Sequence, residues 1–347
     1  MHIETRPAEA SVEGSRPRPL RGASAWLITD GKAGMDVQAR GVADALGLAY
    51  EQKRVEPAKL YSIMSPWGPV SPSERFGDAS GRFGPPWPVI AIATGRASIP
   101  YIRALRRKAG LATYTVVLQD PKTGPGTADL IWVPAHDRRR GANVITTPTA
   151  PHSYSAERLA ALRATLPSAI EALPHPRVAV MLGGKNAVYK FTDEDDQRLA
   201  AALRSLAGRG ASFMITPSRR SHRRLISLVD DATQGAPRIF WDQTGDNPYP
   251  AFLAHADMLV VTADSVNMTG EACATGRPVY VFEPSKGSAK FNRFHRSLRE
   301  YGATRLLPPD FDELAAWDYT PLDSAAIIAR EIEVRWMRRK HMLSGLV

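Results

Sequence analysis

The chain has 347 residues, which is more than one ordinary hydrophobic core accommodates and suits two domains. Hydrophobic residues make up 44% and charged residues 23%, so the composition excludes a mainly disordered chain. The apolar runs are far shorter than the roughly 20 residues of a membrane-spanning helix, which excludes an integral membrane protein of that type. The only cysteine, Cys273, excludes a disulfide scaffold and a cysteine-based zinc site and predicts a cytoplasmic protein.

The net charge of +10 favours an anionic partner: a nucleotide, a phosphosugar, a nucleic acid or an anionic lipid. The basic residues form short, separate clusters and show no zinc-finger spacing or aromatic RNA-binding signature, so we expect no nucleic-acid partner. These clusters are Arg103–Lys108, Arg138–Arg140, Arg219–Arg224 and Arg335–Lys340. Residues 1–23 mix arginine with glutamate and lack the apolar segment of a signal peptide, so we expect a flexible tail.

The first part of the chain alternates short apolar runs with helix-like stretches, a pattern typical of a parallel sheet covered on both faces. The expected strands are 25–30, 89–93, 114–119, 130–133 and 143–147. The expected helices are 37–46 and 99–108. Residues 61–88 are rich in Pro, Gly and Ser and predict a long surface excursion.

A second alternating series follows a predicted helix over 155–173, which Pro174 and Pro176 end. The expected strands are 178–182, 212–216, 238–241, 258–261 and 278–282, with helices over 193–207, 222–229, 250–256, 266–275 and 325–340. The sequence thus predicts an α/β protein with two Rossmann-like, doubly wound domains that face each other across a cleft. The predicted parts are a tail (1–23), a first domain (24–174), a second domain (175–322) and a C-terminal helix (323–347) that packs back on the first domain.

Ligands of open parallel sheets bind beyond the carboxyl ends of the strands, so the residues that leave each strand are the candidates for a site. The string Thr262-Ala263-Asp264-Ser265-Val266-Asn267-Met268-Thr269-Gly270-Glu271 ends a strand and begins a helix. Asp264 or Ser265 can cap that helix and leave backbone amides free for a phosphate. Glu271, about two turns further, can accept the hydroxyls of a ribose or hexose; the alternative is an ordinary capped helix with a solvated glutamate.

Two further loops of the second half suit a diphosphate. Gly183-Gly184-Lys185-Asn186 combines glycines, which permit close backbone approach, with a lysine, although Ala179 and Asn186 break the P-loop pattern and a plain tight turn stays open. Ser218-Arg219-Arg220 offers guanidinium groups, or alternatively only exposed charge at a helix start.

The first half offers a polar edge of the same kind. The segment from Asp30 through Gly31, Lys32 and Met35 to Gln38 leaves the first strand, and it contains no dinucleotide-binding G-x-G-x-x-G. Arg96, Asp120 and Lys122 leave the next two major strands, so we expect them to converge with Asp30. In contrast, Asp193-Glu194-Asp195 matches the short D-x-D string of metal-dependent sugar transferases but begins a helix, where acidic residues complement the helix dipole; we expect no metal site.

Taken together, the T-A-D-S-x-N-M-x-x-E-A-x-x-x-G-R-P-V string, the G-G-K-N loop, the S-R-R segment and the opening T-D-G-K-x-G-x-x-x-Q resemble the bacterial ELM-type family. The resemblance covers about residues 25–339, and the family takes its name from a plant mitochondrial-fission factor. More distantly, the E-A-x-x-x-G-x-P-V segment is similar to the donor-binding half of GT-B glycosyltransferases, including the MurG-like enzymes. That similarity implies a nucleotide-sugar donor in the second domain, an acceptor in the first, and transfer without a metal or other cofactor.

The resemblance and the residues together predict a GT-B-type, inverting glycosyltransferase, with Asp30 or Asp120 as the base. Its donor side comprises Gly183, Gly184, Lys185, Asn186, Ser218, Arg219, Thr262, Asp264, Ser265, Asn267, Met268 and Glu271. Its acceptor side comprises Gly31, Lys32, Gln38, Arg96 and Lys122. Met35 stands where the family pattern has His or Asn and cannot be a base, so that role falls to Asp30, Asp36 or Asp120, or is missing.

Two other functions stay open: a sugar-nucleotide epimerase of the same fold, and a recruitment or scaffold protein without turnover. The basic, amphipathic stretch 332–343, with Trp336 and Met337, predicts either packing on the first domain or peripheral contact with the inner face of an anionic membrane.

Overall fold

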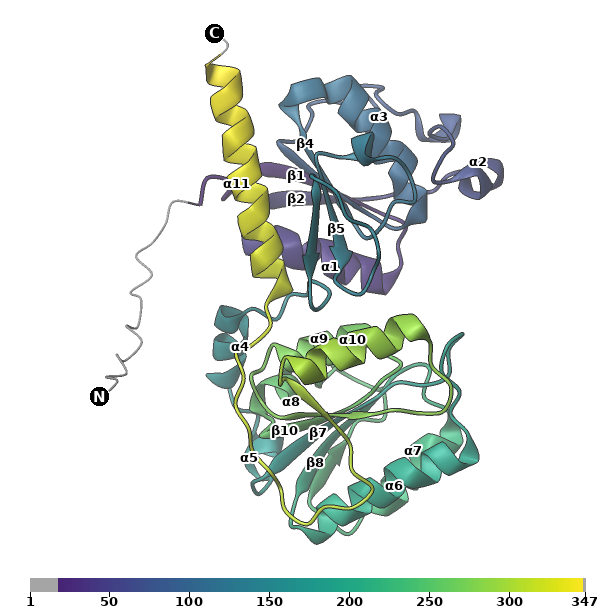
Figure 1. Ribbon diagram of the computed structural model, residues 1–347, viewed down its shortest axis with the longest axis vertical. Helices are drawn as coiled ribbons and strands as arrows, with labels where there is room; N and C mark the ends of the chain where they lie inside the picture. The colour runs from purple at the N-terminus through teal and green to yellow at the C-terminus, as the bar shows by residue number, and fades with distance from the viewer. Residues whose placement is uncertain (1–17, 346–347) are drawn as a thin grey trace, which may run out of the picture.

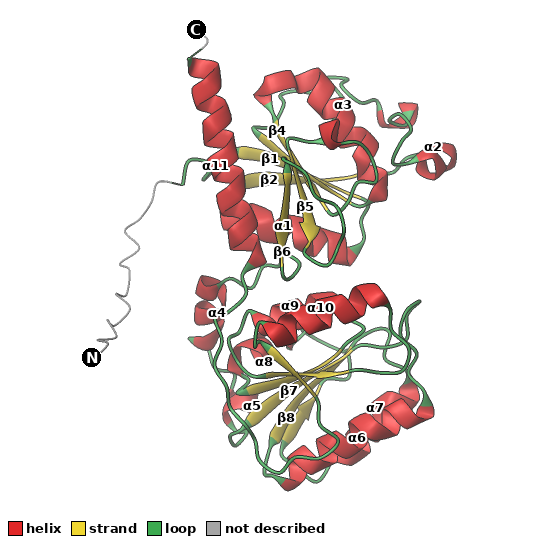
Figure 2. Cartoon of the chain, viewed as in Figure 1, coloured by secondary structure: helices red, strands yellow, loops and turns green. Residues whose placement is uncertain are grey.

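Two parallel sheets, each covered by helices on both faces, form the two lobes of the computed structural model, which describes residues 18–345 (Figures 1 and 2). The fold is α/β, and each lobe is Rossmann-like. This confirms the fold class predicted from the sequence.

The first sheet has the strand order β2-β1-β3-β4-β5-β6, and every pairing is parallel. Its strands are β1 (Ser24–Thr29), β2 (Ala49–Arg54), β3 (Ile90–Thr94), β4 (Tyr114–Leu118), β5 (Leu130–Pro134) and β6 (Val144–Thr147). Its helices are α1 (Ala33–Leu46), α2 (Lys59–Met64) and α3 (Ile99–Ala109). The strands β3 and β4 are apolar and buried throughout because helices cover both faces of the sheet.

The second sheet has the strand order β12-β11-β10-β7-β8-β9 and is also parallel. Its strands are β7 (Arg177–Leu182), β8 (Ser212–Pro217), β9 (Arg238–Phe240), β10 (Met258–Thr262), β11 (Val279–Phe282) and β12 (Thr304–Leu306). Its helices are α6 (Asp193–Gly208), α7 (Arg223–Thr233), α8 (Tyr249–His255), α9 (Val266–Cys273) and α10 (Ala289–Glu300).

The strand orders locate the switch point of each sheet. After β1 the chain adds β2 on one side and then β3 on the other, so the first switch point lies between β1 and β3. In the second sheet it lies between β7 and β10. Crevices outside the carboxyl ends of the strands at such points are where open α/β sheets bind ligands.

The C-terminal helix α11 (Ser324–Ser344) returns to the first lobe and packs beside α1 (Figure 1). Ile328 and Ile332 are fully buried in the core of the first sheet, and Trp336 packs at its edge. The structure therefore supports the packing alternative for residues 332–343. Where the chain enters α11, the hydroxyls of Ser324 and Thr149 form a buried hydrogen bond of 2.7 Å.

The structure corrects several details of the sequence-based prediction. The expected helix over 155–173 is two short helices, α4 (Ala156–Arg163) and α5 (Ser168–Glu171), because Pro167 interrupts it. The excursion over 61–88 is only partly at the surface, since Phe83 is buried and stacks with Phe76 and against Trp26. Of the predicted tail, residues 1–17 lie outside the described residues, but Leu20 is fully buried in the first core.

Candidate functional site

A hydrogen-bonded framework holds the switch point of the second sheet. The Thr262 hydroxyl accepts from the Gly183 amide (2.7 Å) and donates to Asp264 Oδ1 (2.7 Å). Asp264 Oδ2 accepts from the Gly184 amide (3.1 Å) and pairs with Arg220 Nη2 (2.8 Å). A Cβ atom on Gly183 or Gly184 would collide with the Asp264 carboxylate or the Arg220 backbone, so both positions require glycine. Thr262 and Asp264 therefore shape the loops and are not free to hold a ligand.

Three other predicted donor-side residues also bond within their own loops. Asn186 Oδ1 accepts from the amides of Val188 (2.8 Å) and Tyr189 (2.7 Å). The Ser218 hydroxyl accepts from the Arg220 amide (3.2 Å). Ser265 is the N-cap of α9, and its hydroxyl accepts from the Met268 amide (3.3 Å). Of the two caps that the sequence allowed, Ser265 is the one used.

The groups that remain available around this framework are positively charged or amide donors. Lys185 and Arg219 are exposed, and neither forms an ion pair with any residue of the described part. At the start of α9, the amides of Val266 and Asn267 donate no hydrogen bond within residues 18–345. A helix N-terminus with two nearby cations is a favourable environment for a diphosphate.

A cavity of about 300 Å³ lies beside these groups, at the carboxyl ends of β7 and β8 and against α8 and α9. Trp241 and Tyr249 give it aromatic walls, and Arg219 lies at its lining. The sequence analysis did not identify either aromatic residue: Trp241 directly follows β9 and Tyr249 begins α8, and only the tertiary fold brings the two together at the cavity. The remaining lining residues are Leu182, Thr216, Pro217, Ser218, Gln243, Asn247 and Met268.

Glu271 does not line this cavity but lies behind Tyr249, which does. Its side chain is buried, and the Tyr249 hydroxyl donates a hydrogen bond to Glu271 Oε2. Burial raises the pKa of Glu271 to about 7, although the Tyr249 hydrogen bond acts in the opposite direction. Glu271 is therefore not a solvated glutamate, the alternative that the sequence left open: in this structure its carboxylate accepts from Tyr249, which lines the cavity.

At the switch point of the first sheet, Asp30 is the notable carboxylate. It follows β1, pairs with Lys32 Nζ at 3.0 Å through Oδ2, and has a buried Oδ1 without a hydrogen-bond partner. Gly95 packs directly against this carboxylate, and Gly31 packs against the Arg54 guanidinium; both glycines have positive φ. A carboxylate oxygen that lacks a donor is suited to accept a proton from a substrate.

Asp120 differs from Asp30 because its oxygens are already bonded. It accepts from Lys122 Nζ (2.7 Å) and Arg139 Nη1 (2.8 Å). Burial raises the pKa of Asp120, but the hydrogen bonds from Lys122 and Arg139 outweigh that effect and bring it to about 2. Such a stabilised carboxylate is a poor base at neutral pH.

Arg96, Asp120 and Lys122 converge at one cavity as expected, whereas Asp30 is not among the residues that line it. The Arg96 guanidinium donates to the backbone carbonyls of Ser65 (2.5 Å) and Ile63 (2.7 Å), which fixes the end of α2 and the residue after it. Arg96 lines this first-half cavity of about 500 Å³ together with Met35, Gln119 and residues of the 66–67 turn. Lys32, Asp120 and Lys122 line the same cavity.

A chain of amide side chains links the two halves. Gln119 Nε2 donates to Gln38 Oε1 (3.0 Å), and Gln38 Nε2 donates to Asn267 Oδ1 (3.5 Å). Met35 Sδ accepts from Gln119 Nε2 (3.3 Å) and from the Thr94 hydroxyl (3.2 Å). The carboxyl edges of the two sheets therefore face each other, with Gln38 on α1 touching Asn267 on α9.

The acidic run at the start of α6 has a structural explanation. Thr192 and Asp195 form a reciprocal capping box, and Asp195 also accepts from Ser285. Among residues 18–345 there is no group of three or more His, Cys, Asp or Glu side chains that could hold a metal ion.

Comparison with known proteins extends the sequence argument. The chain is 28% identical over 281 residues to the mitochondrial fission protein ELM1 of Arabidopsis thaliana, an alignment that covers 73% of this chain and 66% of that protein. It is 29% identical over 167 residues to an uncharacterized protein of Rickettsia prowazekii, covering 46% of this chain and 47% of that protein. The chain thus spans less than two thirds of the length of these curated relatives.

Among solved structures, the spinosyn forosaminyltransferase SpnP aligns with a TM-score of 0.50 and 11% identity, covering 92% of this chain and 95% of that chain. That similarity concerns the fold, which is the GT-B arrangement of two Rossmann-like halves. No helix within residues 18–345 is both long and apolar enough to cross a membrane.

The family described as "Mitochondrial fission ELM1" matches residues 33–336, a span that includes the whole second sheet and its switch point but begins after β1 and ends within α11. The T-A-D-S-x-N-M string and the G-G-K-N loop lie within the matched span, and the match covers most of the sequence: this chain is a member of the ELM1 family.

Proposed function

We propose that this protein is a glycosyltransferase that binds a nucleoside-diphosphate sugar in its second half and transfers the sugar to an acceptor in its first half. One observation carries the proposal: the switch points of the two sheets face each other through Gln38 and Asn267. On the second side lie unpaired cations and free amides, and on the first side lies a carboxylate oxygen without a donor.

The donor would occupy the second-half cavity and its rim. The nucleobase of the donor would stack against Trp241 or Tyr249, which line the cavity. The diphosphate would lie between Lys185, Arg219 and the amide end of α9, where charge and dipole both favour an anion. These groups stabilise the diphosphate further as it leaves with an additional negative charge.

Acceptor activation is assigned to Asp30. The Asp30 carboxylate takes the proton of the acceptor hydroxyl once the acceptor has displaced the groups packed around it, and the acceptor oxygen then bonds to the anomeric carbon of the sugar. The bond from that carbon to the diphosphate oxygen breaks in the same displacement, so the configuration inverts and the nucleoside diphosphate leaves with the electron pair. Asp120 instead holds Lys122 and Arg139 in place.

Ligand-induced thermal stabilisation tests the donor site. We would measure the melting temperature with a panel of nucleoside diphosphates and their sugars, using Arg219→Ala and, as a charge-matched control, Arg204→Ala on the exposed face of α6. A ligand at 100 times its Kd stabilises the folded state by about 2.7 kcal/mol. Stabilisation by one nucleotide class that weakens only in Arg219→Ala supports the proposal, and no response to any nucleotide refutes it.

Turnover is tested separately with the nucleotide that binds. Asp30→Asn should retain nucleotide affinity and lose transfer to acceptor by about 10²–10⁴-fold, the usual contribution of a general base. Unchanged transfer in this variant would remove Asp30 from the mechanism. Incubation of the donor without acceptor distinguishes an epimerase, which would rearrange the sugar.

A second function, recruitment of a protein partner without turnover, is favoured by Met35. This thioether lines the first-half cavity at a position where a base could act. The name of the Arabidopsis relative, a mitochondrial fission protein, also agrees with an interaction role. Nucleotide binding without transfer to any acceptor, together with a stable partner in pull-down, would favour this function.

A further inference from the structure

An apolar surface is exposed on the first half, beside the first-half cavity, which Trp67 also lines. The short helix α2 projects from the first lobe (Figure 1), and three large apolar side chains of α2 and the turn after it, Leu60, Ile63 and Trp67, are 63–65% exposed. Leu111, which follows α3, is exposed to the same extent. We name these four side chains the α2–α3 surface. Single exposed apolar residues are common, but four of this size along one region call for a partner.

The α2–α3 surface is continuous and fixed in position. Arg103 donates to the backbone carbonyls of Pro66 (3.2 Å) and Trp67 (3.0 Å), and the Trp67 indole donates to the Lys122 carbonyl (3.1 Å). Trp67 and Leu111 line the two ends of one open hollow of about 890 Å³. The indole is therefore held in place at the surface by its own hydrogen bond, so its ordering costs little on binding.

Basic side chains surround these apolar groups. The hollow is also lined by Arg103, Arg106, Arg107 and Arg339, whereas Asp129 is its single lining carboxylate. Asp129 is shared by two guanidinium groups, with Arg106 Nη2 and Arg339 Nη1 each at 3.1 Å. Arg103 bonds only to carbonyls, and Arg107 is exposed without an ion pair within residues 18–345, so a net positive charge remains.

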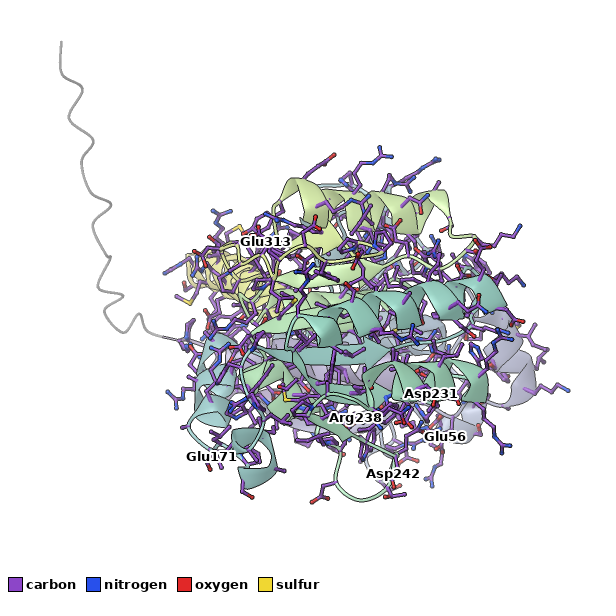
Figure 3. All side chains as sticks on the ribbon, turned by 90° about the horizontal axis from the view of Figure 1, so that it is seen from below. Glu56, Glu171, Asp231, Arg238, Asp242 and Glu313 are labelled. Atoms are coloured by element: carbon purple, nitrogen blue, oxygen red, sulfur yellow. The ribbon has the colours of Figure 1, made fainter. Side chains whose placement is uncertain are left out.

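Exposed carboxylates occur on both halves of the molecule, and on the first half Glu56 lies in the segment before α2 (Figure 3). Figure 3, which views the protein from below, shows Glu171, Asp231 and Asp242 on elements of the linker and the second half. All three are exposed. The apolar and basic character of the α2–α3 surface is thus local and does not extend over the whole protein.

We propose that the α2–α3 surface binds the surface of an anionic lipid bilayer. Leu60, Ile63 and Leu111 would enter the headgroup boundary, Trp67 would lie at the interface that indoles prefer, and the arginines would meet lipid phosphates. The partner is argued from charge complementarity: apolar anchors inside a basic rim match an anionic interface. This surface differs from the stretch 332–343, in which Ile332 is buried in the core of the first sheet and Trp336 packs against that core.

Vesicle co-sedimentation of the full chain tests the proposal, with phosphatidylcholine vesicles compared with vesicles that also contain phosphatidylglycerol. Binding is expected to the anionic vesicles and to fall as salt rises. Arg107→Glu changes the charge by two units, so affinity should fall roughly thirty-fold, at about 1 kcal/mol for each unit of charge. Ile63→Ser should weaken binding as well, because it removes an apolar side chain that would enter the bilayer.

Matched variants on the second half test whether vesicle binding depends on the α2–α3 surface or only on the overall charge of the protein. Arg204→Glu on α6 repeats the charge change, and Leu306→Ser on β12 repeats the loss of an exposed apolar side chain. Both should bind vesicles as the unmodified protein does. Equal losses in these controls, or no binding to anionic vesicles at low salt, would overturn the proposal. A change of oligomeric state in Ile63→Ser without vesicle binding would assign the surface to a second copy of the chain and would also overturn it.

Discussion

The buried carboxyl group of Glu271 makes a quantitative prediction about stability and pH. Its pKa is raised to about 7 by burial, whereas in the unfolded chain it should titrate near 4.5. We predict that Glu271→Gln is about as stable as the unmodified protein near pH 4.5 and becomes progressively more stable than it as the pH rises to 8. Glutamine keeps an oxygen for the Tyr249 hydroxyl but carries no charge.

The direction of this pH dependence follows from the protons that Glu271 binds in the folded and in the unfolded state. Between pH 4.5 and 7 the folded protein retains a proton on Glu271 that the unfolded chain has lost, so raising the pH destabilises the fold. A shift from 4.5 to about 7 corresponds to at most about 3 kcal/mol, since one pKa unit is worth about 1.36 kcal/mol. His152 acts in the opposite direction: burial lowers its pKa to about 4, so its contribution is present above pH 6.5 and is lost as the pH falls toward 4.

Urea unfolding at several pH values measures the effect as the difference between variant and unmodified protein, which cancels the contribution of His152. The control is Glu313→Gln, at an exposed carboxylate on the second half (Figure 3), which should show no such pH-dependent difference. If the free energy of unfolding differs between Glu271→Gln and the unmodified protein by the same amount at pH 5 and pH 8, the pKa of Glu271 is not raised in the folded protein.

Three further predictions concern the framework and the packing of the halves. Gly184→Ala should destabilise the fold by about 1–3 kcal/mol because its Cβ meets the Arg220 backbone, whereas Gly208→Ala at the end of α6 meets nothing and should be neutral or stabilising in urea unfolding. Ile332→Ala should cost about 2–4 kcal/mol because its side chain is fully buried, and Ile327→Ala on the exposed face of α11 much less; equal losses would contradict the packing of α11 on the first sheet. Thr149→Val should lose about 1–3 kcal/mol by leaving the buried Ser324 hydroxyl unpaired, and Thr149→Val with Ser324→Ala should recover part of it in the same assay.

The buried strands could be predicted from the sequence because continuous apolar runs show directly in the residues. The strand β2 was missed because five of its six residues are exposed at the sheet edge and show no apolar pattern. The helix α10 and strand β12 were missed as well, since α10 is rich in arginine and β12 has only three residues. The missed elements lie at or near the edges of the sheets, where burial constrains the sequence least.

The loops that form the candidate site were predicted correctly in position, since polar residues after buried strands mark the carboxyl edge of a sheet. Their bonding could not be predicted, because it depends on contacts between distant segments. Asp264 meets Gly184 and Arg220, and Glu271 meets Tyr249, which belong to other strands and helices. The roles of Lys185 and Arg219 stay predictions, which the nucleotide titration addresses.

The hydrogen bond between Thr149 and Ser324 has a mechanical consequence. Within the described residues the chain passes between the halves after β6 and again just before α11, and this bond ties the two crossings together. Separation of the two crossings would leave two buried hydroxyls unpaired, so the bond favours rotation of the halves about these hydroxyls over their separation. The ion pair between Lys290 Nζ and Asp137 Oδ1 (2.6 Å), on α10 and on the loop after β5, is a second contact between the halves that such a rotation would break. On the proposed function, breaking this ion pair would admit the donor sugar between the two facing sheet edges.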